Sequence, residues 1–201
     1  MRTTAIFWFL QYLALLFPTI VLAQSPQDNW FFGTNAWISF PQGGGAPIAK
    51  SGGLLSTNEG SSSISDSSGN LLFYTDGVTV WNKNHQVMSN GTGLNGNSSS
   101  THSALIVPCS CDKYLIFTTD AAEKDNKLGL RYSLVDMTKN NGNGDVVGSK
   151  NVLLVAPASE KIAAVRDSAG TGFWVVGHGV GNNRFLSYHI GEDCHPGTPV
   201  I

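Results

Sequence analysis

Short apolar runs, each bounded by glycine, asparagine, aspartate or serine, limit most strongly how this chain can fold. The runs are rich in β-branched and aromatic residues and show no helical periodicity, so each one predicts a β-strand. The predicted strands are residues 71–75, 79–81, 104–107, 114–118, 130–135, 162–165, 173–176 and 185–188. Many short strands with turn residues between them indicate an all-β architecture.

The predicted strands also recur in a fixed order. Three units begin near Glu59, His102 and Glu160, and each contains a strand, a tight turn, a strand, a turn and a further strand. Asp66 and Asp167 both precede a glycine by three residues, as expected for β-turns that begin with an aspartate side chain. Linking segments such as residues 150–155 would supply a fourth strand to a unit, and residues 33–55 would lead into the first unit.

Units of about 40 to 50 residues are typical of propeller blades. We therefore predict WD-like β-propeller blades, about three in number, across residues 24–201. Three blades cannot close a ring, and their exposed sheet edges would invite aggregation. Either the sequence is a fragment of a longer propeller, which is the simpler interpretation, or the fold is open or oligomeric.

The first 23 residues predict export from the cytoplasm. Arg2 precedes an apolar stretch over residues 5–22, and residues of small or moderate size, Val21 and Ala23, occupy the −3 and −1 positions before Gln24. This pattern is typical of a secretory signal peptide cleaved between Ala23 and Gln24. The alternative is a membrane anchor, because about 20 apolar residues span a bilayer. Pro18 and the polar segment that begins at Gln24 favour cleavage, and we expect no membrane span after it.

Composition narrows the classes of function. The 201 residues include 12 Lys and Arg against 14 Asp and Glu, so the basic excess typical of nucleic-acid binding is absent. The sequence also has no Gly-x-Ser-x-Gly motif, no His-Glu-x-x-His motif and no phosphate-binding loop. We accordingly predict no catalytic residue, no metal site and no cofactor.

The three cysteines leave three interpretations open. Cys109 and Cys111 stand close together in the sequence, and Cys194 lies far downstream. In an oxidising compartment, one of the first two could form a disulfide with Cys194. The alternatives are free thiols, or a metal site that also uses His195, although that spacing is not a standard zinc pattern.

Several long sequence segments resemble the N-terminal propeller of large surface proteins of gliding bacteria. Those proteins carry a gliding-motility-associated C-terminal domain, which is also called a type B sorting domain for type IX secretion. The segments are residues 29–36, 55–60, 65–82, 90–96, 130–137 and 150–154, and the resemblance extends over residues 28–201. It implies a WD-like propeller, contact with a secretion machinery, and a location in the periplasm, on the cell surface or outside the cell. The sorting domain of those proteins is not part of this sequence, so passage across the outer membrane is not implied.

The sequence offers one candidate binding site. Glu59, His102 and Glu160 begin the first strand of their units, and in a propeller that strand lines the central channel. Two carboxylates and an imidazole at one channel mouth could bind a cation or transfer protons. The alternative is that each residue caps a turn or pairs with a neighbour. A second set follows the second strand of each unit and is expected to close turns: Asp76, Asp120 and His178.

The leading hypothesis is a non-catalytic adhesion or scaffold protein whose partner is a surface protein or a glycan. A polysaccharide-active or metal-dependent propeller enzyme is the alternative, and it requires Glu59, His102 and Glu160 to converge in one channel. A glycan-binding lectin module is a third possibility. It requires two or more exposed tryptophans in one groove, although tryptophans such as Trp30, Trp37 and Trp81 more often pack between blades.

Overall fold

A computed structural model describes residues 25–201. In that part of the chain, fourteen strands form antiparallel meanders, and the remaining elements are three short 3-10 helices: η1 (Ser25–Gln27), η2 (Ala122–Lys124) and η3 (Asn140–Gly142). No helix within it is long and apolar enough to cross a membrane. The predicted signal peptide, with its cleavage site between Ala23 and Gln24, lies outside the described residues.

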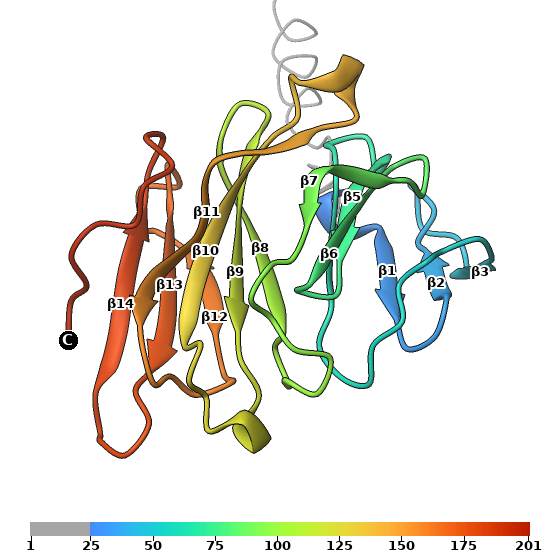
Figure 1. Cartoon of the computed structure of the whole chain (residues 1–201). Helices are drawn as coiled ribbons and strands as arrows, with labels where there is room; N and C mark the ends of the chain where they lie inside the picture. The colour runs from blue at the N-terminus through green and yellow to red at the C-terminus, as the bar shows by residue number, and fades with distance from the viewer. Residues whose placement is uncertain (1–24) are drawn as a thin grey trace, which may run out of the picture.

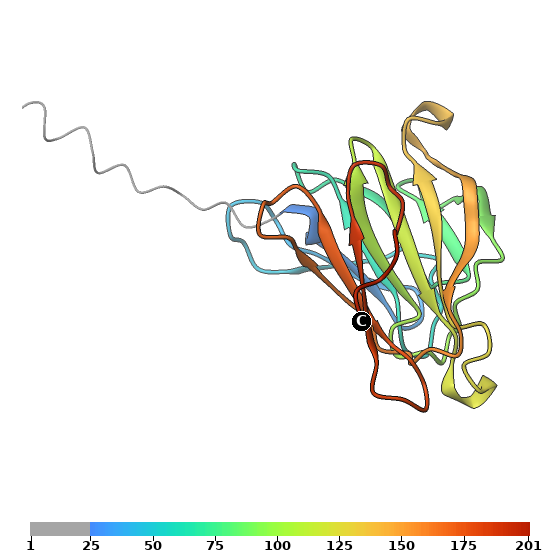
Figure 2. The ribbon, with the colours of Figure 1, turned by 90° about the vertical axis from the view of Figure 1, so that its left-hand side faces the viewer.

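Four meanders follow one another along the chain. The first contains β1 (Asn29–Phe32), β2 (Ala36–Ser39) and β3 (Ile48–Lys50). The second contains β4 (Ser62–Ser65), β5 (Leu71–Thr75), β6 (Thr79–Asn82) and β7 (Val87–Thr92). The third contains β8 (Ala104–Ser110), β9 (Lys113–Thr119), β10 (Leu130–Asp136) and β11 (Asp145–Val155). The fourth contains β12 (Ala163–Arg166), β13 (Phe173–His178) and β14 (Phe185–Ile190). Figure 1 shows them side by side in chain order, and Figure 2 shows the ribbon from the side of the fourth meander.

The second and third meanders join into one eight-stranded sheet, whereas the first and the fourth are separate three-stranded sheets. The junction is a single parallel pairing of Ser89 on β7 with Asp145 on β11. The two edge strands of this sheet, β4 and β8, lie beside each other. The Ile106 amide of β8 donates a hydrogen bond of 3.2 Å to Ser62 Oγ of β4. The eight-stranded sheet is therefore nearly closed on itself.

Three apolar clusters lie between consecutive meanders. Phe31 and Tyr74 belong to the cluster between the first and second meanders, and their rings stack with centroids 3.8 Å apart. Ile64 and Ile116 belong to the cluster between the second and third. Leu115 of the third meander packs in the last cluster with the fourth. Because side chains alternate between the two faces of a strand, each of the two central meanders contributes to two clusters.

The turns follow the aspartate pattern of the sequence. Asp66 Oδ1 accepts hydrogen bonds of 2.8 and 2.9 Å from the backbone amides of Ser68 and Asn70. Asp167 Oδ1 accepts a bond of 3.0 Å from the Thr171 amide, so both side chains hold the turn between the first two strands of a meander. Gly69 has a φ of 79°, which glycine adopts without steric cost. These two turn predictions are confirmed.

The prediction of an all-β protein is confirmed, and each predicted strand has a counterpart within one or two residues of its bounds, except that the strand predicted at residues 104–107 continues to Ser110. The units that begin near residues 59, 102 and 160 correspond to the second, third and fourth meanders. Residues 29–50 form a further meander, where only a lead-in segment was expected. This meander has no Asp-x-x-Gly turn, and its strands are short, so the pattern that revealed the other units is absent. The three-bladed partial propeller itself stays a prediction.

The sequence left several cysteine pairings open, and in the structure Cys109 and Cys194, which lie 85 residues apart in the sequence, form a disulfide. Cys111 is a free, exposed thiol. The disulfide ties β8 to the segment after β14 beside the apolar cluster of the third and fourth meanders.

We expect Cys194→Ser to lower the free energy of unfolding by about 2 to 4 kcal/mol, because a long loop of the unfolded chain is no longer closed. Chemical denaturation with and without reductant measures this effect. The matched control is Cys111→Ser, which should leave stability unchanged. An equal loss of stability in both variants would contradict the assignment of the disulfide.

Candidate functional site

The first strands of the meanders are neighbours, and a run of serines joins three of them. β1 lies beside β4, and β8 lies beside both β4 and β12. Ser61 Oγ donates a hydrogen bond of 2.7 Å to the Phe31 carbonyl oxygen, and Ser63 Oγ donates to the Asn29 carbonyl oxygen. Ser62 faces the other way, and its Oγ accepts the hydrogen bond from the Ile106 amide of β8. The alternation of side chains along β4 thus directs successive hydroxyls to opposite neighbours.

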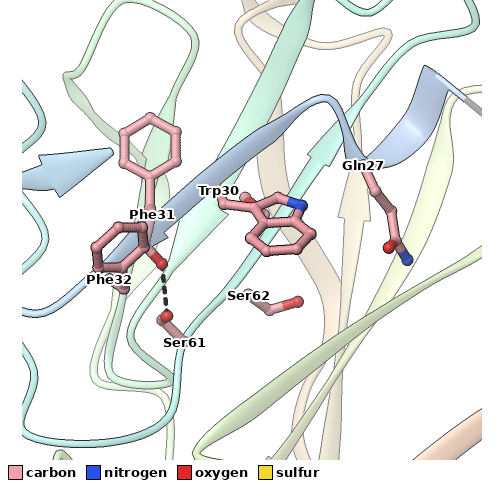
Figure 3. A pocket seen from close by; sticks show the side chains of 7 residues that line it. Gln27, Trp30, Phe31, Phe32, Ser61 and Ser62 are labelled. Atoms are coloured by element: carbon pink, nitrogen blue, oxygen red, sulfur yellow. Dashed lines mark hydrogen bonds between the residues drawn. The ribbon is translucent and has the colours of Figure 1, made fainter. Parts of the chain in front are cut away.

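A shallow groove of about 320 Å³ runs between β1 and β4. Figure 3 shows its lining side chains, with Trp30 and Phe32 from β1, Gln27 from η1, and the serines from β4 and the residue before it. Trp30 is 50% exposed, and its ring centroid lies 4.9 Å from that of Phe40. An exposed aromatic face beside hydroxyl and amide groups provides both apolar contact and hydrogen-bonding capacity for a ligand.

A second cavity, of about 380 Å³, lies between β4, β8 and β12. Its walls are mostly apolar and include Ile64, Leu105, Val107 and Phe173. Arg166 supplies the one charged side chain of the lining, and its guanidinium carbon lies 5.5 Å from the centroid of the Phe173 ring. Gln27 lines both cavities, so they are neighbours along the first strands, and we call the two together the inner-strand groove.

Glu160, one of the three predicted site residues, is held by neighbouring loops. Its Oε2 accepts hydrogen bonds of 3.0 Å from the Thr101 amide and 2.8 Å from the Thr101 hydroxyl. Its Oε1 accepts a further bond from the Ala122 amide. Partial burial alone would raise the pKa of the Glu160 carboxyl, but these hydrogen bonds outweigh it, and the pKa lies below its ordinary value. The carboxylate therefore joins the third meander to the fourth.

His102 and Glu59 do not complete a reactive cluster with Glu160. His102 Nδ1 accepts a hydrogen bond of 3.2 Å from the Ile162 amide, so this imidazole also connects the third and fourth meanders. Glu59 is exposed, its backbone amide bonds to the Ser98 carbonyl oxygen at 3.0 Å, and its carboxylate makes no hydrogen bond or ion pair within residues 25–201. No three His, Cys, Asp or Glu side chains of the described residues lie together as metal ligands would. The alternative assignment, in which such residues cap turns and pair with neighbours, fits His102 and Glu160.

Two residues of the second predicted set, Asp76 and Asp120, hold a turn and a loop, whereas the third, His178, makes a ring contact. Asp76 Oδ1 accepts bonds of 2.8 and 2.7 Å from the amides of Val78 and Thr79, and so closes the turn before β6. Asp120 accepts bonds from the amides at both ends of the loop before β10, at Ala121 and Leu128. The ring of His178 lies 4.8 Å from that of Phe185, between centroids.

Two tryptophans pack in the apolar cluster between the first and second meanders, and one lines the groove. Trp81 is buried, and Trp37 stacks on Phe31 with ring centroids 4.9 Å apart. Trp30 is the one tryptophan that lines the inner-strand groove among the described residues. Sequence reasoning considered Trp30, Trp37 and Trp81 together and missed Arg166 and Ser62, because nothing local to these residues indicates a groove that forms between strands of different meanders.

Comparison with protein-family models, with curated proteins and with solved structures finds no match to this chain.

We expect Glu160→Ala to lower the free energy of unfolding by about 1 to 2 kcal/mol at neutral pH, because two backbone amides lose a charged acceptor. Since folding lowers the pKa of Glu160, its contribution is present above the ordinary value of 4.5 and is lost as the pH falls through the lower pKa of the folded protein. The difference between the variant and the wild type should therefore shrink in acid, as urea unfolding at several pH values would measure. Glu59→Ala is the matched control, with no effect expected at either pH.

Proposed function

We propose that this protein is an exported, non-catalytic binding or scaffold module of the propeller type, as the resemblance to surface proteins of gliding bacteria implies. Its location would be the periplasm, the cell surface or the medium, and its partner a surface protein or a glycan. The observation that carries the proposal is the stacking of four meanders whose first strands meet along one groove. Propellers place the first strand of each blade in the same way, around a central channel.

The positions of the candidate acid and base groups support binding rather than catalysis. A general acid or base must reach the proton that it transfers, at about 2.6 to 3.2 Å between heavy atoms. Glu160 and His102 instead accept hydrogen bonds from backbone amides that join two meanders. The enzyme alternative required these residues to converge with Glu59 in one channel, and the geometry gives that alternative no support.

The lectin alternative required at least two exposed tryptophans in one groove. The inner-strand groove has Trp30 alone, with Phe32 beside it. Trp174 lies on a different meander, where its ring contacts His189 with centroids 4.9 Å apart. Among the described residues, the groove therefore has no two-tryptophan sugar platform, and a glycan partner would bind through Trp30 with Phe32 beside it.

We expect the purified protein to hydrolyse none of a panel of polysaccharides, chromogenic glycosides and peptides. Hydrolysis that is lost in Glu59→Ala or in Glu160→Ala would overturn the proposal. Urea unfolding of each variant must accompany the assay, since Glu160→Ala is also expected to destabilise the fold.

Export has its own test. Expression of the full sequence in a Gram-negative host should yield a periplasmic protein whose N-terminal residue is Gln24, as Edman degradation or mass spectrometry would detect. An uncleaved protein in the membrane fraction would support the anchor alternative instead.

A further inference from the structure

The inner-strand groove has one charged side chain among the described residues, Arg166 at the end of β12. Its guanidinium lies over the Phe173 ring and makes no hydrogen bond or ion pair within residues 25–201. The adjacent carboxylate is engaged elsewhere, because Asp167 Oδ2 lies 3.0 Å from His189 Nε2. No described aspartate or glutamate lines either cavity. The N–H donors of Arg166 are therefore available to an anion in the groove.

The strand edges beside the groove offer few free backbone groups. The hydroxyls of Ser61 and Ser63 donate to two carbonyl oxygens of β1. On β8, the Ile106 amide donates to Ser62 Oγ, and Pro108, two residues further along the same edge, has no N–H to donate. A peptide that adds as a strand needs a row of unpaired backbone groups at an edge. The groove therefore favours a ligand that side chains recognise.

Trp30 provides such a side chain in the first cavity. Its ring is 50% exposed and is supported by Phe40, with centroids 4.9 Å apart. Figure 3 shows Gln27 on one side of the ring and Phe32 on the other, with Ser62 close by. The ring can pack against the apolar C–H face of a sugar, and the amide and hydroxyl groups beside it can bond to the sugar hydroxyls.

We propose that the inner-strand groove binds an acidic oligosaccharide, with one sugar ring on Trp30 and the carboxylate of a uronic acid on Arg166. A planar guanidinium forms two parallel hydrogen bonds with a carboxylate, and the single positive charge of the groove matches that group. Several linked sugars are needed, because Trp30 and Arg166 line different cavities that share Gln27. This inference rests on the proposed function and names the ligand class of the same groove.

The test is isothermal titration calorimetry of the purified protein with short oligomers of galacturonate, of mannuronate and of hyaluronan. Each oligomer is also used as its methyl ester, which keeps the sugar chain and removes the charge. An oligoglutamate peptide represents an acidic protein partner. The variants are Arg166→Gln, Arg166→Lys and Trp30→Ala. The matched control is Arg184→Gln, because Arg184 is an exposed arginine of the fourth meander that does not line the groove.

We expect at least one uronate oligomer to bind, and its methyl ester to bind about tenfold more weakly, because a charge-assisted hydrogen bond is lost. Arg166→Gln should weaken binding of the acid by about the same factor and leave binding of the ester unchanged. Arg166→Lys should restore part of the loss, since it keeps the charge without the planar fork. Trp30→Ala should weaken the acid and the ester alike, and Arg184→Gln should change neither.

Four results would overturn the proposal. The first is that no uronate oligomer binds at millimolar concentration, and the second is that the ester binds as tightly as the acid. The third is an equal loss of acid binding in Arg166→Gln and Arg184→Gln. The fourth is tighter binding of oligoglutamate than of every saccharide, which would indicate an acidic protein partner. Circular dichroism and thermal unfolding of each variant establish that a loss of affinity is not a loss of fold.

Failure of this inference and failure of the proposed function give different results. A protein that binds none of the oligosaccharides and hydrolyses nothing would refute the acidic glycan and leave a scaffold with a protein partner in place. Release of shorter saccharides from a bound uronate oligomer would instead refute the non-catalytic function and leave the ligand class in place.

Discussion

The whole architecture depends on sheets that are apolar on both faces. A meander of three or four strands cannot bury two apolar faces by itself, so each of the two central meanders packs between two neighbours. Phe73 and Tyr74 illustrate the constraint, since these adjacent residues of β5 are both fully buried and point into different clusters. The order of the meanders in space follows from this requirement, because each of the three apolar clusters lies between meanders that are consecutive in the chain.

Polar side chains determine how the stacked sheets are aligned. Apolar packing is not directional, whereas a hydrogen bond fixes the distance and orientation of two groups. Ser61 and Ser63 connect the second meander to the first, and Glu160 and His102 connect the third to the fourth. All four residues lie on or near the first strands. Two of the three residues that the sequence offered as a reactive site, His102 and Glu160, therefore align the third and fourth meanders.

Much of the fold could be predicted because strands and turns are specified locally. The aspartate turns at Asp66 and Asp167 are read directly from the spacing of an aspartate and a glycine, and the apolar runs fix the strands. The first meander could not be found in this way, since its turns lack that spacing. The three candidate site residues were expected to begin the first strands, and they precede β4, β8 and β12 by two or three residues. Thr101, Ala122 and Ile162, the partners of Glu160 and His102, lie in other segments and could not be inferred from spacing.

The sequence by itself determined the all-β class, the order of the strands and the turns that join them, because these depend on side-chain alternation and backbone preferences over a few residues. Tertiary structure alone decided that Cys109 rather than Cys111 pairs with Cys194, that Trp30 is exposed while Trp81 is buried, and that Glu160 is a structural acceptor. Each of these outcomes depends on which segments, distant along the chain, meet when one sheet packs on the next. No local pattern contains that information, because burial and hydrogen bonding are properties of the neighbours as much as of the residue.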